Sequence, residues 1–261
     1  MARKKYELAL DDSIDFLGHK LFRIRALIDF GSVKAGDLGG YIESDKNLSH
    51  EGNAWVASNA KVYGNAEVFG DARVSGSAKV YDNAGVSDNA EVFGDAEVFG
   101  DAEVFDSARV YDKAQVSGSA RVYDNAGVSD NAEVFGDAQV FDSARVFGDA
   151  KVYEDAEVFG DAKVYGTAKV FGYAEVYGNS EVWRNSQVFG YAEVYGNAEI
   201  WENAQVSGSA KVYEHAEVFG DAKVYGNAEI WENAQVSGSA KVYDNGEVYG
   251  YVKVYGNAEI W

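Results

Sequence analysis

From Gly52 to Trp261 the chain repeats one pattern of hydrophobic and polar positions every six residues, without a gap. A small residue, Ala in nearly every repeat, is followed two positions later by Val or Ile, and turn-forming residues come next. Two residues is the side-chain period of a β-strand, so the small and the branched residue point to one face. Branched side chains also favour a pleated strand. Each unit therefore predicts a short strand followed by a tight corner.

The corners are pairs such as Gly64-Asn65, Gly70-Asp71 and Asp82-Asn83. Gly adopts positive φ without penalty, and Asn or Asp tolerates it and can bond its own backbone. One unit cannot bury its apolar face, but a stack of units can. The fixed period therefore predicts an all-β solenoid in which the Val row fills the interior and the Ala row lies where the walls converge.

The residues that alternate with these two rows are expected to face outward. The position before Val is Lys, Glu, Arg or Gln in most repeats, and the position after it is aromatic in 28 of 35 repeats. In a solenoid each of these rings is expected to stack on the equivalent ring one coil away.

The pattern Val-x-x-x-Ala-x resembles the hexapeptide repeat of left-handed parallel β-helix proteins, the fold of the trimeric acyltransferase-like superfamily, over residues 52–261. This resemblance implies a three-sided, left-handed solenoid with about 18 residues per coil. Most β crossovers are right-handed, so the left hand rests on the resemblance alone. Residues 23–27 and 35–44 resemble the head of uncharacterised bacterial and phage members with an N-terminal β cap.

Residues 1–50 do not follow the period. Segments 5–10 and 20–28 predict two strands of a hairpin, and residues 11–13 and 18–19 predict loops between them. We expect this hairpin to cover the open end of the first coil, because an uncovered coil end is an exposed sheet edge.

The segment that follows predicts an irregular first coil, in which Gly40 takes the small-residue position and Ile42 and Leu48 lie six residues apart. The predicted division is a β cap with an irregular first coil at 1–50 and a hexapeptide-repeat β-helix at 51–261.

The net charge of −20 lies almost entirely in the repeats, where 15 basic and 34 acidic residues follow residue 53. Such acidity disfavours nucleic acid and anionic membranes as ligands. The absence of Cys excludes disulfides and thiolate metal sites. The start Met1-Ala2-Arg3-Lys4-Lys5 leads into no apolar run, so we expect no signal peptide, no membrane span and a cytoplasmic location.

The resemblance implies that any enzyme of this fold would use a His in a cleft between neighbouring solenoids, shaped by extruded loops. Here His19 and His50 lie in the cap region, His215 occupies a corner, and no loop interrupts the period. We therefore expect a non-enzymatic protein with no catalytic, cofactor-binding or metal-binding residues and no cofactor. The corner Asp residues are interpreted as turn formers, and the single Thr, Thr167, excludes an ice-binding Thr array.

Like-charged Glu residues recur every 18 positions, as in Glu157, Glu175 and Glu193 and again in Glu181, Glu199 and Glu217. Stacked carboxylates should raise one another's pKa and attract cations weakly. We therefore expect the solenoid to become more stable on mild acidification.

Longer duplications are offset by 42 residues (Asn-Ala-Gly-Val-Ser-Asp at 83 and 125) and by 30 residues (Asn-Ala-Glu-Ile-Trp at 197, 227 and 257). Neither offset is a multiple of 18, so in a three-sided coil Trp201, Trp231 and Trp261 should lie on different sides. Such copying is an argument against a ligand site confined to one side.

The densest variation among the repeats defines a candidate interaction surface. Arg184 replaces a Gly or acidic residue, Ser180 and Ser186 replace inward Ala, and Tyr173 and Tyr191 should stack. Two interpretations of the outer aromatics remain open: a ladder that stabilises the coil, or a surface for self-association or glycan stacking. The candidate residues are Tyr173, Trp183, Arg184, Tyr191, Trp201 and Trp261.

The primary hypothesis is a structural scaffold that forms a homo-oligomer, either side to side or through the C-terminal end, which stops at Trp261 in mid-repeat without a visible cap. The alternative is an acidic module that imitates DNA and occupies a basic protein partner, which competition with DNA would reveal. A degenerate hexapeptide acyltransferase is the least favoured hypothesis, and a measurement of acyl-CoA binding would test it.

Overall fold

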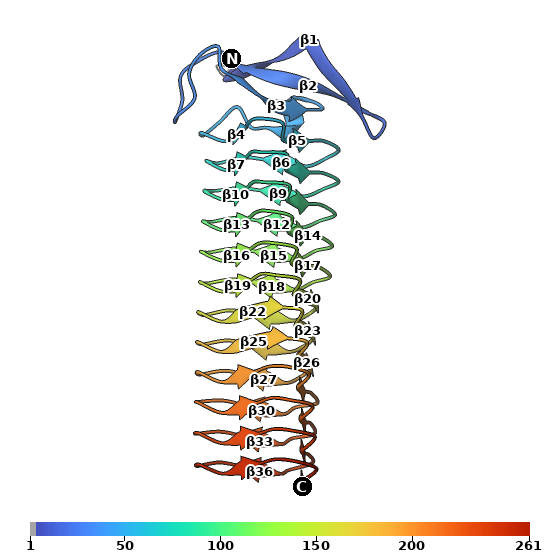
Figure 1. Cartoon of the computed structure of the whole chain (residues 1–261). Coiled ribbons are helices and arrows are strands. Elements are labelled where there is room, and N and C mark those ends of the chain that lie inside the picture. The colour runs from blue at the N-terminus through green and yellow to red at the C-terminus, as the bar shows by residue number, and fades with distance from the viewer. Residues whose placement is uncertain (1–3) are drawn as a thin grey trace. The chain divides into compact units, whose positions relative to one another are not determined.

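The computed structural model describes residues 4–261, so residues 1–3 of the predicted basic start lie outside the described residues. The chain divides into two compact units, Met1–Asn125 and Ala126–Trp261. Each unit is a β-solenoid whose coils contribute one short strand to each of three parallel sheets (Figure 1). Within residues 4–261 there is no α-helix, only the short 3-10 helix η1 at Asp45–Asn47. The predicted all-β solenoid is confirmed.

In unit Met1–Asn125 the strands form three sheets. The first sheet contains β1 Tyr6–Phe16, β2 His19–Ala26, β3 Leu38–Ile42, β5 Lys61–Val62, β8 Lys79–Val80, β11 Glu97–Val98 and β14 Gln115–Val116. The second contains β4 Trp55–Val56, β7 Arg73–Val74, β10 Glu91–Val92 and β13 Arg109–Val110. The third contains β6 Glu67–Val68, β9 Gly85–Val86, β12 Glu103–Val104 and β15 Arg121–Val122.

In unit Ala126–Trp261 the strands also form three sheets. The first contains β17 Glu133–Val134, β20 Lys151–Glu154, β23 Lys169–Gly172, β26 Gln187–Gly190, β29 Gln205–Val206, β32 Lys223–Val224, β35 Lys241–Val242 and β38 Glu259–Ile260. The second contains β16 Gly127–Val128, β19 Arg145–Val146, β22 Lys163–Gly166, β25 Glu181–Arg184, β28 Glu199–Ile200, β31 Glu217–Val218, β34 Gln235–Val236 and β37 Lys253–Val254. The third contains β18 Gln139–Val140, β21 Glu157–Val158, β24 Glu175–Val176, β27 Glu193–Val194, β30 Lys211–Val212, β33 Glu229–Ile230 and β36 Glu247–Val248.

Strands pair in parallel with residues 18 positions further along the chain. Val98 lies opposite Val116 in the first sheet of one unit, and Val176 lies opposite Val194 in the third sheet of the other. This register confirms the three-sided coil of 18 residues. The left hand of the coil stays a prediction.

The interior is built from the two predicted rows. The Val and Ala rows are buried from Ala54 to Val242. The Ala row leaves little space for a side chain: at Gly246, which stands in this row, an added Cβ would lie 3.0 Å from the Val242 side chain and 3.0 Å from the Ile260 carbonyl. The walls therefore converge at this row, as predicted.

At each corner the first residue of the pair has the left-handed conformation, as Gly160 does with φ 69°. An added Cβ there would lie 2.9 Å from the Gly178 backbone nitrogen, one coil further. The second residue of the pair, for which the sequence also allowed positive φ, does not adopt it in either described unit. Several non-Gly residues are forced into this conformation, including Glu154 at 62° and Arg184 at 60°.

Replacing Glu154 with Gly should raise the free energy of unfolding by about 1 kcal/mol, because an L-residue in the left-handed region is strained and Gly is not. Asp155→Gly is the matched control, because Asp155 follows directly and has no positive φ. That variant should lose about 0.5–1 kcal/mol through chain entropy. Urea unfolding followed by circular dichroism measures both, and equal losses in the two variants would contradict the assignment of strain.

The predicted N-terminal hairpin is present as β1 and β2, which pair antiparallel. The loop predicted at residues 11–13 is wrong: β1 continues to Phe16 and accommodates the polar residues in an irregularity between Ala9 and Ser13. The chain turns at Leu17 and Gly18, both with positive φ, one residue before the turn predicted at residues 18–19. β2 pairs with β3, which pairs in parallel with β5, so the hairpin extends the first sheet beyond the first coil.

The irregular first coil is also present. Ile42 lies opposite Val62 and Leu48 bridges to Val68, so the separation is 20 residues here where the regular coils have 18. Gly40 occupies the small-residue position, where a Cβ would lie 2.6 Å from the Ala60 carbonyl oxygen. Not even Ala fits there.

Two side chains donate hydrogen bonds to backbone carbonyls of residues 51–66 that accept no amide from an earlier strand within residues 4–261. The Lys5 ammonium donates to the carbonyl of Ala54 at 2.9 Å and to those of Glu51 and Gly52 at 3.4 Å. The Asn47 amide donates likewise to two further carbonyls, those of Gly64 and Ala66. In later coils such carbonyls accept amides of the coil before, so these side chains replace missing backbone donors. Burial lowers the pKa of Lys5 to about 8.

Candidate interaction surface

Two candidate Trp residues lie in one aromatic ladder on the second sheet of unit Ala126–Trp261. The rings of Trp183 and Trp201 stack at 5.1 Å between centroids, and the ladder continues through Tyr165 and Phe219. The stacking predicted for outward rings is thereby confirmed here. Because each ring has one face on each neighbour, the ladder presents mainly ring edges to solvent.

Arg184 ends the strand β25 beside this ladder. Its guanidinium contacts the Glu202 carboxylate at 3.1 Å, and its backbone carbonyl accepts a hydrogen bond from the Thr167 hydroxyl at 2.8 Å. Both charged side chains reach solvent, so the ion pair contributes less than about 1 kcal/mol to stability. Arg184 is therefore held by its neighbours along the coil axis.

Tyr173 and Tyr191 occupy corner positions that Asn, Asp or Ser fill in most repeats. Their rings stack at 5.0 Å with an angle of 5° between the planes, as predicted. They are 54% and 63% exposed, more than most rings of the ladders. The pair follows strands β23 and β26 of the first sheet, so it stands at a different corner from the Trp ladder.

Trp261 lies apart from the other candidates, beyond β38. Its ring is tilted by 34° against Tyr243 at 6.2 Å and is 73% exposed. The copies of the Trp-containing repeat fall on different sheets, as predicted: Trp201 follows β28, Trp231 follows β33 and Trp261 follows β38. The structure therefore unites only the Trp183–Trp201–Arg184 group and the Tyr173–Tyr191 pair.

Ser180 and Ser186 are fully buried in the Ala row and contribute nothing to the surface. The Ser180 hydroxyl donates to the carbonyl of Tyr177 at 2.9 Å and lies 3.2 Å from that of Val194, and Ser186 repeats this arrangement six residues later. Each buried hydroxyl therefore has its hydrogen-bonding requirement met by nearby backbone carbonyls. These two substitutions are structural.

The stacked Glu residues do not all behave as predicted. Burial and the neighbouring Glu157 and Glu193 carboxylates raise the pKa of Glu175, and burial and flanking Glu residues raise that of Glu199. The prediction is wrong for Glu181, because a hydrogen bond from Lys163 at 2.8 Å lowers the pKa of that carboxyl. Cationic partners thus interrupt the like-charged columns.

The melting temperature should rise as the pH falls from 7 to about 5. Glu175 and Glu199 have folded pKa values above their ordinary value of 4.5. The folded chain therefore binds their protons more readily, and stability increases as the pH falls through the folded pKa values towards 4.5. Below that range the lowered pKa of Glu181 reverses the trend. Thermal unfolding of wild type and Glu175→Gln tests this. The lowered pKa of His50 opposes the trend equally in both proteins, so a wild-type melting temperature that does not rise relative to that of Glu175→Gln between pH 7 and 5 would refute it.

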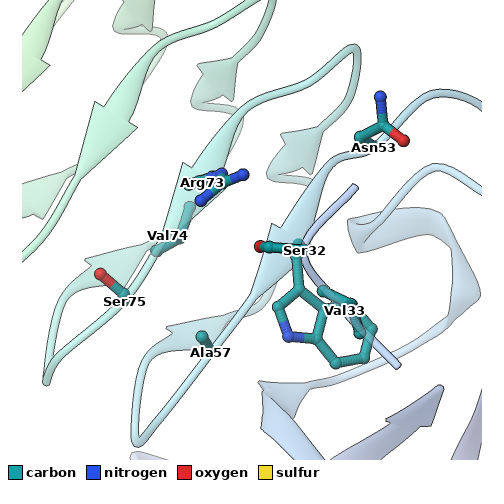
Figure 2. Close-up of a pocket in the computed structure, with 8 residues that line it drawn as sticks. Ser32, Val33, Asn53, Ala57, Arg73, Val74 and Ser75 are labelled. Carbon is teal, nitrogen blue, oxygen red and sulfur yellow. The ribbon is translucent and has the colours of Figure 1, made fainter. Parts of the chain in front are cut away.

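Sequence reasoning missed a groove of about 190 Å³ in unit Met1–Asn125, between the loop after β2 and the second sheet. Figure 2 shows Ser32 and Val33 of that loop beside Arg73, which lies on β7. Phe30 of the same loop packs edge-on against Trp55 at 5.4 Å. Ala57 and Ser75, two consecutive non-aromatic residues on this sheet, were the signal that a ladder was interrupted here.

The three His residues have different surroundings. His19 contacts the Glu43 carboxylate at 3.0 Å, and His50 stacks on Tyr6 at 4.3 Å with a pKa lowered by burial. His215 is a corner residue whose amide donates to the Glu232 carbonyl. Over residues 4–261 no group of three His, Cys, Asp or Glu side chains is placed to hold a metal ion. The same residues include no helix that is long and apolar enough to cross a membrane.

The chain matches no known protein-family model and no curated protein.

Proposed function

We propose that this protein is a non-enzymatic structural scaffold of the hexapeptide-repeat type, with a left-handed coil, that acts in the cytoplasm by associating with further copies of itself. Support for a structural role comes from the uninterrupted 18-residue register of unit Ala126–Trp261. No inserted loop breaks that register between residues 126 and 261 to build a pocket.

The contact surface proposed for self-association is the Tyr173–Tyr191 pair. Most outer rings of the ladders already use both faces on neighbours, so little of their area is free for a partner. The two corner tyrosines project into solvent with more than half of their surface exposed. Tyr combines a large apolar area with a polar hydroxyl and loses little entropy on binding, which suits an interface.

Sedimentation velocity over a range of concentrations tests the proposal. The wild type should form a defined oligomer or growing polymers. A Tyr173→Asn/Tyr191→Asn variant restores the residue that stands at most corners and should shift association to at least tenfold higher concentration.

The control variant Tyr173→Phe/Tyr191→Phe keeps both rings and should associate like the wild type. A wild type that stays monomeric at every concentration would refute self-association. Unchanged association of the Asn variant would place the contact elsewhere and refute this surface.

A further inference from the structure

The aromatic ladder on the third sheet of unit Met1–Asn125 lacks one ring. Phe69, Ser87 and Phe105 occupy equivalent positions in three successive coils, because Val68 lies opposite Val86 and Val86 lies opposite Val104. Phe105 stacks on Tyr123 at 4.9 Å with parallel planes, so its other face is turned towards the coil of Ser87. Phe69 has no ring partner among residues 4–261 and is 44% exposed.

Along the coil axis, the gap between Phe69 and Phe105 is high enough for one stacked ring. Strands stack at about 4.8 Å, so Phe69 and Phe105 stand about 9.6 Å apart along the coil axis. Stacked ring pairs elsewhere in the same unit have centroids 4.9–5.1 Å apart. A planar ring placed midway would therefore reproduce the stacking distance of the ladder on both of its faces.

A second substitution widens the gap. The residue before Val86 is Gly85, whereas nearly every other repeat has a long side chain at this position. A Cβ added at Gly85 would meet nothing within 4 Å. The result is a slot of about 220 Å³ lined by Phe69, Gly85, Ser87, Asp88, Glu103 and Phe105.

The slot is acidic. Its lining contains two carboxylates, Asp88 and Glu103, and no basic residue. Asp88 accepts a hydrogen bond from the Ser87 hydroxyl at 3.0 Å, and Glu103 contacts Arg121 at 3.2 Å on the side away from Gly85. A ligand that brings a positive charge would therefore find a carboxylate at the slot, while an anionic one would be repelled.

We propose that this slot binds a planar aromatic ring that carries a cationic group, with the ring between Phe69 and Phe105 and the cation near Asp88. The ring would gain stacking on two faces, which aromatic pairs prefer in offset arrangement. The proposal concerns a surface distinct from that of self-association and does not depend on it.

Calorimetric titration of the full chain with tryptamine tests the site. The sequence Gly-Val-Ser recurs at residues 127–129 and leaves an equivalent gap there. Every titration therefore uses protein that also carries Ser129→Tyr, which fills this second gap. Tryptamine should bind with one-to-one stoichiometry, at least tenfold more tightly than neutral tryptophol. Indole-3-acetate should bind more weakly still. Absence of tryptamine binding at millimolar concentration, or equal binding of all three ligands, would overturn the proposal.

Two variants locate the site. Ser87→Tyr adds the missing ring to the ladder, and Gly85→Gln places a long side chain in the slot. Each should therefore weaken tryptamine binding at least tenfold. Ser87→Tyr should also raise the melting temperature, which shows that it folds. The matched control is Ser207→Tyr, because Ser207 leaves a similar gap between Phe189 and Tyr225 but is preceded by Gln205 instead of Gly. Binding lost equally in this control, or retained in both slot variants, would contradict the assignment.

Discussion

Replacing Lys5 with Met should lower the free energy of unfolding of unit Met1–Asn125 by about 3 kcal/mol, because buried acceptors then lose a charged donor. The Lys5 ammonium is within 3.4 Å of three carbonyl oxygens and 4.9 Å from the centroid of the Phe30 ring. Met fills a similar volume but donates nothing. The loss is partly offset because the desolvation of the ammonium, visible in its lowered pKa, is also removed.

Urea denaturation of the full chain, with the fluorescence of Trp55 followed in a variant in which the other Trp residues are replaced by Phe, measures this effect. Lys4→Met is the control: Lys4 is exposed and, within residues 4–261, its only ion pair is with Asp45 at 3.1 Å, so its loss should change stability by less than about 0.5 kcal/mol. Equal effects of the two substitutions would show that the carbonyl groups of the first coil do not need Lys5.

Replacing Ala192 with Leu should cost about 3 kcal/mol or more, because the Ala row has little space for added carbon atoms. Ala192 is fully buried, and its carbonyl accepts the amide of Glu175 from the preceding coil at 3.0 Å. A larger side chain must therefore push against the wall of the coil and disturb backbone pairing. We expect the melting temperature to fall sharply and amide protection to be lost in the adjacent coils.

Ala192→Ser is the matched control for this position. Ser180 and Ser186 already occupy the same row, fully buried and hydrogen-bonded to backbone carbonyls. Ser should therefore be tolerated at residue 192, with a cost below about 1 kcal/mol. If Leu were tolerated as well as Ser, the walls of the coil would have to be more adaptable than the contacts at Gly246 indicate.

The repeat region was predictable to the level of single residues. The spacing of Ala and Val predicts the strands, the inward rows and the stacking of rings such as Tyr173 and Tyr191, and the structure contains all of them. Prediction succeeds here because each residue packs against its equivalent 18 positions away. The periodic sequence therefore contains the tertiary contacts as well as the local ones.

The candidate surface was predicted less well. The sequence analysis grouped Trp183, Tyr173 and Trp261 as candidates, and the structure places them at separate locations. The gap at Ser87 was visible as a missing aromatic residue, but its importance depended on Gly85 in the same coil and on Phe69 and Phe105 in the coils on either side.

By itself the sequence determined the all-β solenoid, its burial pattern and its acidic exterior, because one short-range rule, repeated every six residues, specifies both the strand and its neighbours. Only the tertiary structure decided how the first coil is covered, since the bonds from Lys5 and Asn47 join residues that no period relates. The lowered pKa of Glu181 does not belong to this group, because the 18-residue register places Lys163 directly opposite Glu181 and the sequence alone could have predicted that pair. The bonds from Lys5 and Asn47 depend on where the non-repeating N-terminal segment places these two side chains in three dimensions, which the repeat pattern does not encode.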